Sequence, residues 1–221
     1  MLILDLFSGT GSVCKEANRL GWNVVSVDIN DKYSTPTFKT NIMDWNYKIF
    51  NPGAFDVIFA GVPCEAYSSL QAINKTPERR EADICESNKV VRRTLEIINH
   101  LKPKVWFIEN PDGGRLKHQL FMRGLPFYVV SYCKYGFPYR KNTRIWTNLK
   151  GFEPKRCRND CEQRGEDGRH LYTIGSSSKN CGEFQKRLFK LNEKYAYPPQ
   201  LIRELLQSQH DTEDNFWLNL C

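Results

Sequence analysis

Short apolar runs alternate with longer amphipathic segments over the first 150 residues of the chain. Each run is roughly four to eight residues long and is bounded by glycine, proline or polar residues, which is typical of a buried strand. We predict seven strands, at residues 2–7, 23–28, 40–45, 54–60, 104–111, 125–132 and 145–148. Helical spacing of apolar residues separates several of them, most clearly at 12–20 and 77–100. This alternation predicts an α/β fold: a doubly wound, mostly parallel, Rossmann-like sheet with helices on both faces.

The pattern changes after residue 149. Apolar periodicity disappears there, and Arg, Asp, Gly, Ser and Cys dominate the next thirty or so residues. Helical spacing returns at 184–191 and again after Pro198, a favourable residue for a first helical turn. We therefore divide the chain into a main α/β domain at 1–149, a small loop-rich insertion at 150–182, helices at 183–206 that return to the main domain, and a tail at 207–221.

The chain carries 32 Lys and Arg against 25 Asp and Glu, which gives a formal charge of +7 over 221 residues. This balance favours an anionic partner, and nucleic acid is the commonest one. No apolar run reaches membrane-spanning length, and the chain opens on a strand pattern rather than a secretory leader. We expect a protein that stays inside the cell, contacts no membrane and keeps most of its eight cysteines reduced.

The first two predicted strands flank a glycine-bearing turn and a helix. Gly9 and Gly11 lie in the turn, and Asp28 ends the second strand. In a βαβ unit of this kind the glycines let the backbone approach a ligand, and the acid accepts hydrogen bonds from ribose hydroxyls. With two glycines rather than three, an adenosine ligand without phosphate suits the turn as well as a dinucleotide does. The alternative is that the glycines only make the turn and Asp28 caps a loop.

Two reactive side chains follow later strands. Cys64 lies in a turn just after the fourth strand, and Glu109 lies near the end of the fifth. Because carboxyl ends of parallel strands share one edge of the sheet, both side chains face the ligand-binding side. A thiolate is a strong nucleophile, a carboxyl can donate a proton, and Arg144 could add positive charge. The alternative reading of Cys64 is a small loop side chain without chemistry.

Five segments of the chain match, in order, the motifs of one enzyme family. They are residues 5–11 with the glycine turn, 61–68 with Pro63 and Cys64, 109–111 with Glu109, 139–146 with Arg144, and 195–199 with a double proline. In these segments the chain resembles the DNA (cytosine-5-)-methyltransferases, in a compact form like those of phages and large viruses. The resemblance implies a class I S-adenosylmethionine-dependent methyltransferase fold. It also implies methyl transfer from S-adenosylmethionine to C5 of cytosine in DNA.

The resemblance assigns roles residue by residue. Cys64 would attack C6 of a cytosine flipped out of double-stranded DNA, because C6 is inaccessible inside the duplex. Glu109 would hold the N3 edge, and Arg144 would support the pyrimidine carbonyl and the thiolate. The S-adenosylmethionine-binding residues that it implies are Phe7, Gly9, Gly11, Asp28, Ile29, Asn41 and Pro63. The first domain would then be catalytic and the insertion a small recognition element.

The chain departs from the family at several positions. Glu65 stands where glutamine is common, and Asn41 stands where an aspartate usually meets the adenine amino group. The recognition region is also short. Its basic residues would contact phosphates, which sets affinity rather than sequence preference, so we expect a short or relaxed recognition sequence. These residues are Lys150, Lys155, Arg156, Arg158, Arg164 and Arg169.

Two other functions fit the same motifs. The chain could be a catalytically degenerate homologue that binds DNA or S-adenosylmethionine without turnover. It could also be a cytosine-5 methyltransferase acting on transfer RNA, since such relatives share the Pro-Cys and Glu-Asn signals; RNA is the less favoured substrate. In each case we expect a monomer located in the cytoplasm, the nucleus or a viral factory.

The insertion contains a candidate zinc set rather than an assigned metal. Cys157 and Cys161 have plausible ligand spacing, and His170 and Cys181 could complete the set. Unpaired thiols and a disulfide are the alternatives. The cysteines that we interpret as packing or surface residues are Cys14, Cys85, Cys133 and Cys221.

Overall fold

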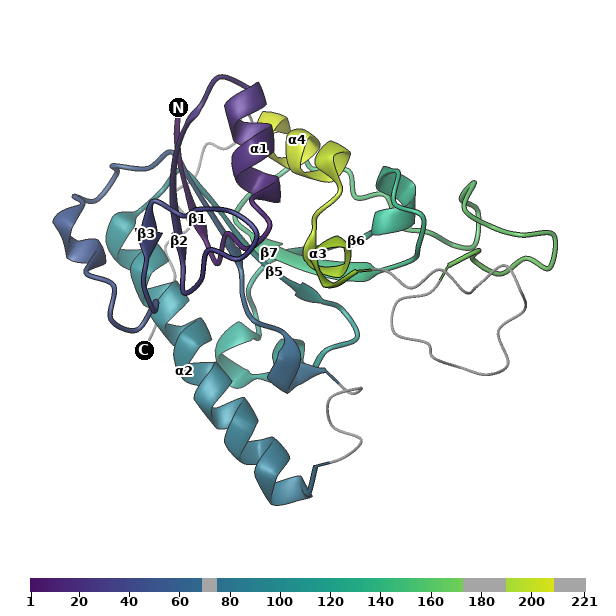
Figure 1. The fold of residues 1–221 in the computed structure, drawn as a ribbon, viewed down its shortest axis with the longest axis horizontal. Helices are drawn as coiled ribbons and strands as arrows, with labels where there is room; N and C mark the ends of the chain where they lie inside the picture. Colours follow the sequence, from purple (N-terminus) through teal and green to yellow (C-terminus); the bar gives the residue numbers. More distant parts are fainter. Residues whose placement is uncertain (69–74, 173–189, 209–221) are drawn as a thin grey trace.

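A single seven-stranded sheet organises the chain, and its strands run in the order β3-β2-β1-β4-β5-β7-β6 (Figure 1). The structure is a computed structural model that describes residues 1–68, 75–172 and 190–208. The strands are β1 (Leu2–Leu6), β2 (Asn23–Asp28), β3 (Phe38–Lys39), β4 (Val57–Gly61), β5 (Val105–Pro111), β6 (Phe127–Ser131) and β7 (Asn142–Thr147). Pairing is parallel from β3 to β5 and antiparallel on both sides of β7. The chain leaves β1 toward β2 and later returns on its other side as β4, so the topological switch point lies at β1.

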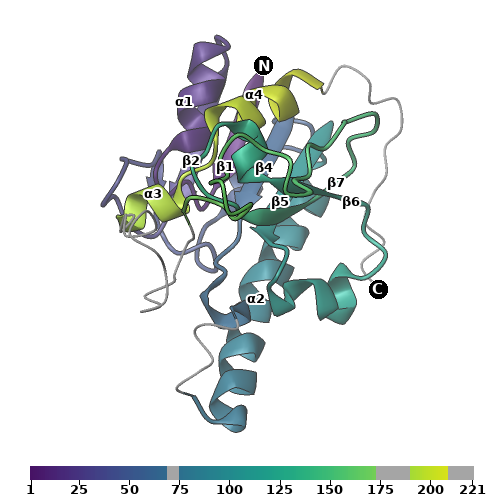
Figure 2. The same ribbon diagram turned by 90° about the vertical axis from the view of Figure 1, so that its right-hand side faces the viewer.

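Helices cover both faces of the sheet. The α-helices are α1 (Ser12–Arg19), α2 (Pro77–Leu101), α3 (Leu191–Tyr195) and α4 (Pro199–Gln207). The 3-10 helices are η1 (Tyr47–Ile49), η2 (Glu65–Tyr67), η4 (Arg115–His118), η5 (Leu120–Met122) and η6 (Tyr132–Tyr135). Figure 2 shows α1 and α4 on one side of the strands and α2 on the other. Among the residues that the structure describes, no helix combines the length and the apolar character needed to cross a bilayer.

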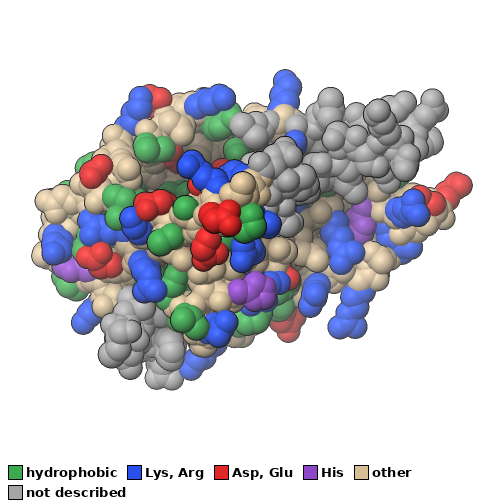
Figure 3. All heavy atoms as spheres, turned by 90° about the horizontal axis from the view of Figure 1, so that it is seen from below, with side chains coloured by type: hydrophobic (Ala, Val, Ile, Leu, Met, Phe, Trp, Pro, Cys, Tyr) green, Lys and Arg blue, Asp and Glu red, His purple; other side chains and the backbone are tan. Residues whose placement is uncertain are grey.

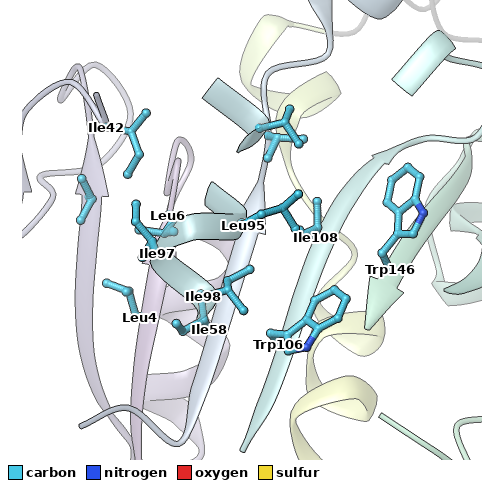
Figure 4. Close-up of a cluster of buried hydrophobic side chains, with 14 of the residues drawn as sticks. Leu4, Leu6, Ile42, Ile58, Leu95, Ile97, Ile98, Trp106, Ile108 and Trp146 are labelled. Carbon is cyan, nitrogen blue, oxygen red and sulfur yellow. The ribbon is translucent and has the colours of Figure 1, made fainter. Parts of the chain in front are cut away.

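The larger core lies between α2 and the sheet. The side chains labelled in Figure 4 come from both layers: Leu4, Leu6, Ile58, Trp106, Ile108 and Trp146 from the strands, Ile42 from the turn after β3, and Leu95, Ile97 and Ile98 from α2. Each fully buried side chain of this size contributes about 1.5–3 kcal/mol. The helix begins where the Thr76 side chain accepts a hydrogen bond from the Arg79 N–H, with Pro77 in its first turn.

The other core joins α1 and α4 to the opposite face of the sheet. Apolar residues of both helices are buried there: Val13, Ala17, Leu201, Ile202, Leu205 and Leu206. The carboxylate of Glu16, which is buried, accepts a hydrogen bond from Arg203 at 3.0 Å and also pairs with Arg19. The end of the described chain is thereby tied to the first helix, which places the segment just before α4 at the carboxyl edge of the strands.

The predicted fold class is confirmed, but one strand was predicted in the wrong place. Residues 40–45 form a turn, and the third strand is the two-residue β3 just before it. The Asn41 side chain accepts from the Met43 N–H at 3.0 Å, and its carbonyl accepts from the N–H groups of Asp44 and Trp45. Buried Ile42 and Trp45 anchor this turn, so their apolar character does not mark a strand. Of the predicted helix at 184–191, residues 184–189 lie outside the described residues.

The stretch from 150 to 172 runs as an irregular segment beyond β6 (Figure 1). It starts from buried Leu149 and Phe152, which belong to the core under α4. Its described residues form neither helix nor named strand, only the isolated bridges Tyr139↔Tyr172 and Arg164↔His170. The remaining residues of the predicted insertion, 173–182, lie outside the described part of the chain.

Candidate active site

A cavity of about 460 Å³ opens where β1, β2, β4 and β5 end. The predicted site residues that line it are Phe7, Gly9, Asp28, Ile29, Asn41, Pro63, Cys64 and Glu109. They come from four strand ends and from the turn after β3. The topology gathers them because β1 is the switch point, where neighbouring connections leave in opposite directions and open a crevice. Its volume falls in the range of small-molecule sites, about 300–1,000 Å³.

The end of β1 has an unusual backbone. Phe7 has φ +61° and Gly9 has φ +46°, both in the left-handed region. A non-glycine residue there costs about 1–3 kcal/mol, and such strain is often found at functional sites. The Gly9 N–H donates to Asp28 Oδ2 at 2.8 Å, and its carbonyl accepts from the Ser34 hydroxyl at 2.7 Å. The turn is therefore held against the end of β2, with its backbone facing the cavity.

Gly11 has a different position from the one expected. It does not line the cavity but forms the N-cap of α1 with φ +68°. A side chain at this position would also meet the Ser34 Cβ at 3.2 Å. The glycine is therefore required by the turn into the helix rather than by contact with a ligand.

Asp28 and Ile29 line the cavity at the end of β2, where they provide a polar and an apolar side chain. Each Asp28 oxygen accepts one main-chain N–H, from Gly9 and from Asn30. A carboxylate oxygen can accept a second bond, so Asp28 can still bind ribose hydroxyls. Ile29 is 64 % exposed and lines the cavity, where an adenine ring could pack on its side chain. The Asn41 side-chain oxygen, used by Met43, likewise has capacity for one further bond. These residues fit an adenosine-type cofactor.

Cys64 lies in the turn after β4, just before η2. The turn is anchored at both ends: the Asn110 side chain donates to the Val62 carbonyl at 3.1 Å, and the buried Tyr67 donates to Asn88 of α2 at 2.9 Å. Burial, followed by the negative charges of Glu65 and Glu109, raises the pKa of the Cys64 thiol to about 11. The side chain is therefore a thiol at neutral pH in the ligand-free protein.

Glu109 is buried at the end of β5 and is held from three sides. Tyr197 donates to its Oε2 at 3.0 Å, Tyr132 donates to its Oε1 at 3.4 Å, and the Lys141 ammonium lies 3.8 Å away. Burial, followed by the charge of Glu109, raises the pKa of both phenols well above the ordinary value, so both remain donors. This arrangement fixes the carboxyl group in one orientation toward the cavity.

Tyr197 also explains Gly61. A Cβ at residue 61 would overlap with the Tyr197 hydroxyl, so only glycine leaves room for the phenol that holds Glu109. The Tyr197 ring packs edge-on against Phe59, with centroids 5.3 Å apart, and its N–H donates to the Ser12 hydroxyl. The segment before α4 thus reaches across the sheet edge into the site.

The structure does not place Arg144 at the cavity. Its Nε donates to Asp112 at 2.9 Å, and its guanidinium lies 3.7 Å from the centroid of the Phe127 ring. In the antiparallel register Arg144 faces Asn110, one residue beyond Glu109, and side chains alternate between faces along a strand. The cationic group that lines the cavity beside Glu109 is Lys141, just before β7. Lys141 was expected only to add positive charge near Arg144, and no role was predicted for Tyr197, although both line the cavity and lie in the matched segments.

The predicted groups of the insertion fall into two sets. The six basic residues proposed for phosphate contact are all exposed, and Figure 3 shows Lys and Arg side chains spread over the face seen from below. Of these, Lys155 pairs with Glu204, and Arg164 bonds backbone carbonyls of its own loop. Of the candidate zinc set, Cys157, Cys161 and His170 lie together, joined by Cys133, while Cys181 lies outside the described residues.

Comparison with known proteins identifies the family of the chain. The family model for C-5 cytosine-specific DNA methylases matches residues 1–119. The chain is 37% identical to a probable DNA (cytosine-5)-methyltransferase of Frog virus 3 over 93% of this chain and 99% of that protein. It is 27% identical to the type II methyltransferase M.HpaII of Haemophilus parainfluenzae, over 50% of this chain and 31% of that one.

A solved structure shows the same fold at low identity. The methyltransferase EhMeth of Entamoeba histolytica superposes with a TM-score of 0.52 at 19% identity, covering 71% of this chain and 56% of that one. A family model that covers more than half of the chain and a viral relative that covers nearly all of it lead to one conclusion. The chain belongs to the C-5 cytosine-specific DNA methylase family.

Proposed function

We propose that this protein transfers a methyl group from S-adenosylmethionine to C5 of cytosine in double-stranded DNA, through a covalent bond between Cys64 and C6. One observation carries the proposal. The Cys64 thiol and the Glu109 carboxyl line the same cavity as the strained turn after β1 and the Asp28 carboxylate. A candidate nucleophile, an acid and a nucleoside cradle therefore share one space, and the family match supports its use as a methyltransferase site.

The cofactor half of the cavity is formed by the ends of β1 and β2. Asp28 would accept the ribose hydroxyls, Ile29 would pack on the adenine ring, and Asn41 would contact its edge. Phe7, Gly9 and Pro63 would complete the walls. When bound, S-adenosylmethionine supplies an electrophilic methyl group on a sulfonium. The chain's own contribution is to orient this group toward the Cys64 side of the cavity, a positioning effect that large rate enhancements depend on.

The covalent step begins at Cys64. Its thiol must lose a proton, because the thiolate is the nucleophile. The sulfur then bonds to C6, the C5=C6 electron pair moves through the ring, and N3 takes up, through the Glu109 carboxyl, the proton that the thiol gave up. This makes C5 an electron-rich enamine carbon that can accept the methyl group, with the neutral thioether S-adenosylhomocysteine as the leaving group. A base then removes the C5 proton, the S–C6 bond breaks, and N3 gives up its added proton.

Glu109 would contact N3 of the cytosine while the sulfur of Cys64 bonds to C6. Its two phenol donors and Lys141 hold the carboxyl group in place, so it can meet N3 without reorganisation. Lys141 also opposes the rise in the pKa of Cys64, so its charge favours the thiolate. We infer that Lys141 supplies the cationic support first expected of Arg144, while Arg144 positions Asp112 at the end of β5.

The target base must leave the duplex to reach this cavity. The segment that follows Cys64, including η2, is the element closest to the nucleophile along the chain and would close over the flipped cytosine. Tyr195 contacts it, since its hydroxyl lies 3.3 Å from Glu65. The exposed basic residues of the insertion would bind phosphates. With so short a recognition element at 150–182, we infer a short or relaxed recognition sequence.

The test is a transfer assay with a tritiated methyl group on mixed-sequence duplex DNA. We expect incorporation by the unaltered protein and its loss in Cys64→Ser, with S-adenosylmethionine binding retained in calorimetry. Cys85→Ser is the matched control, because Cys85 is exposed on α2 outside the cavity. Transfer by Cys64→Ser at the control's rate would exclude the thiolate mechanism.

Two further arms separate the alternatives. Transfer RNA replaces duplex DNA in the first arm, and preference for it would make the protein an RNA methyltransferase. In the second arm, cofactor and DNA binding are measured on the unaltered protein. Binding of both without any incorporation would identify a catalytically degenerate homologue.

A further inference from the structure

Four metal-ligating side chains converge outside the catalytic cavity, next to the end of β6. Cys133 belongs to η6, while Cys157, Cys161 and His170 come from the irregular segment after β7. One ligand atom from each lies within 4.8 Å of every other. Cys133, Cys157 and His170 are buried, and Cys161 is partly exposed. Residues separated by up to 37 positions along the chain are thus brought to one point.

Hydrogen bonds between thiols and imidazole do not account for this geometry. The sulfur of Cys157 lies 3.4 Å and that of Cys161 lies 3.2 Å from the same nitrogen, His170 Nε2. That nitrogen offers one hydrogen or one lone pair, so it can make one such bond well. Three cysteines can form at most one disulfide, and all three are free. A cation at the centre would bind all four atoms at once.

We propose that Cys133, Cys157, Cys161 and His170 bind one structural zinc ion. Three thiolates and one imidazole are a common closed set for zinc. Tetrahedral bonds of about 2.3 Å to sulfur and about 2.0–2.1 Å to nitrogen would separate the ligand atoms by roughly 3.6–3.8 Å. The two sulfur–nitrogen distances of 3.4 and 3.2 Å are slightly shorter than this, and every pair of ligand atoms lies within 4.8 Å, so side-chain shifts of about 1 Å or less would suffice. Because the protein fills all four positions, the ion would have no open site for chemistry.

Hydrogen bonds to neighbouring residues hold Cys157 close to Cys133. The Ser131 hydroxyl accepts from the Cys157 N–H at 3.0 Å, and the Ser131 N–H donates to the Lys155 carbonyl at 3.0 Å. These two bonds dock the insertion on the last residue of β6, directly before η6. Lys134 spans the same junction, since its ammonium donates to the Asp160 carbonyl at 3.2 Å. Such supporting bonds hold metal ligands in register.

The other two proposed ligands, Cys161 and His170, lie in tight turns. Asn159, between Cys157 and Cys161, has φ +64° and receives a hydrogen bond from Arg140 at 3.1 Å. His170 closes a short hairpin in which the Gly165 N–H donates to the Arg169 carbonyl at 2.9 Å. A segment with so little regular structure buries little apolar surface, so a metal can supply the missing folding free energy.

This set differs from the one suggested by the sequence. The sequence offered Cys181 as the fourth candidate, although His170 and Cys181 are poorly spaced for a standard zinc finger, whereas the structure brings Cys133 to the other three. Cys133 lies in a different element, and its role is visible only once β6 and the insertion are docked. The two sets make opposite predictions for single substitutions, which makes the proposal testable.

The experiment measures metal directly, without an activity assay. The full chain is purified without chelator from zinc-supplemented culture, and its zinc content is determined by elemental mass spectrometry. We expect about one zinc ion per chain, released by a strong chelator with a fall in thermal stability. Replacement by Co²⁺ should give the visible absorption of a tetrahedral, thiolate-bound ion. Absence of bound zinc together with absence of this spectrum would overturn the proposal.

Single variants identify the ligands. Cys133→Ser and Cys161→Ser should lower the zinc content at least several-fold, whereas Cys85→Ser and Cys181→Ser should retain it. Loss of zinc in Cys181→Ser with retention in Cys133→Ser would refute the proposed set. Because a serine variant can fail to fold, Cys161→His serves as a second test: it keeps a ligand, so zinc should remain while the Co²⁺ spectrum shifts. Failure of Cys161→His to bind while its far-ultraviolet circular dichroism is unchanged would also count against the site.

Discussion

Two carboxylates lie beside the proposed nucleophile and oppose its ionisation. Burial contributes most, and the charges of Glu65 and then Glu109 add to it, so the pKa of Cys64 rises to about 11. With a pKa this far above neutrality, the thiol form of Cys64 predominates strongly at pH 7. The free protein should therefore be protected from alkylation and oxidation, and a substrate that engages Glu109 should relieve part of the charge.

Glu65→Gln tests this electrostatic account. Removing a negative charge lowers the pKa of Cys64, so alkylation of Cys64 by iodoacetamide at pH 7.5 should become several-fold faster. The rate is followed by mass spectrometry of the peptide that contains Cys64, across a pH series. Glu86→Gln, at an exposed position on α2, is the control. An unchanged alkylation profile in Glu65→Gln would contradict the account.

Asp5 is a second residue whose pKa is shifted by burial. It is buried in β1 and accepts a hydrogen bond from the Cys14 thiol at 3.1 Å, and burial raises the pKa of Asp5 to about 7. The folded state therefore favours the protonated form, and this contribution to stability is lost as the pH rises through about 7.

Asp5→Asn should abolish the loss of stability that ionisation of Asp5 causes as the pH rises. Relative to the unaltered protein, its free energy of unfolding should grow by about 2–3 kcal/mol between pH 5 and pH 8. Urea unfolding at both pH values measures this difference, and Asp31→Asn at an exposed position is the control. A difference that does not change with pH would show that Asp5 is ionised throughout.

At the scale of elements, several segments meet on one carboxyl group. Glu109 belongs to β5, Tyr132 to η6, Lys141 to the segment before β7, and Tyr197 to the segment between α3 and α4. The packing of α4 on α1 holds the last of these in place. The site thus depends on how elements dock, because each supplies one donor or one charge.

Gly61→Ala tests this docking. The new methyl group would displace the Tyr197 hydroxyl and so loosen Glu109, and misplacement of this order costs about a hundredfold in rate. Tyr197→Phe removes one hydrogen bond without a clash and should cost less, about tenfold. Gly113→Ala is the control, since a Cβ there meets nothing within 4 Å. Equal rates for Gly61→Ala and Gly113→Ala in the transfer assay would disprove the linkage.

Over the whole molecule the chain has a net charge of +7, and part of this charge lies on exposed Lys and Arg side chains of the irregular segment at 150–172. Phosphate contacts release counterions, so each one removed should weaken binding to all sequences alike and lower the salt dependence by about one unit of slope. Arg156 and Arg158 are exposed and are suitable positions for testing phosphate contact. Lys155, the residue just before them, already pairs with Glu204.

Arg156→Gln and Arg158→Gln together should lower duplex DNA affinity several-fold at moderate salt, with a salt slope smaller by up to about two. Fluorescence anisotropy on two unrelated duplexes measures both quantities. Lys155→Gln, which loses a charge already paired, should have a smaller effect. Weakening on one duplex but not on the other would mean that these arginines read sequence rather than phosphate.

Local patterns predicted most of the strands, helices α1, α2 and α4, and the gathering of most of the predicted site residues at one cavity. Cys64, Glu109, Asp28 and the turn at Gly9 could be placed together because each lies at or just after the carboxyl end of a strand, and parallel strands end at one edge. The two-residue β3 was missed because so short a strand has no periodicity, and apolar anchors of a turn imitate one.

Contacts between distant parts of the chain account for the features that local patterns did not predict. Lys141 rather than Arg144 reaches Glu109 because the register and face of an antiparallel strand are set by its neighbour. Tyr197 holds Glu109 only because α4 packs on α1, and Cys133 joins the candidate zinc ligands only because the insertion docks on β6. Local patterns encode elements, whereas these partners are brought together by packing, which no spacing along the chain records.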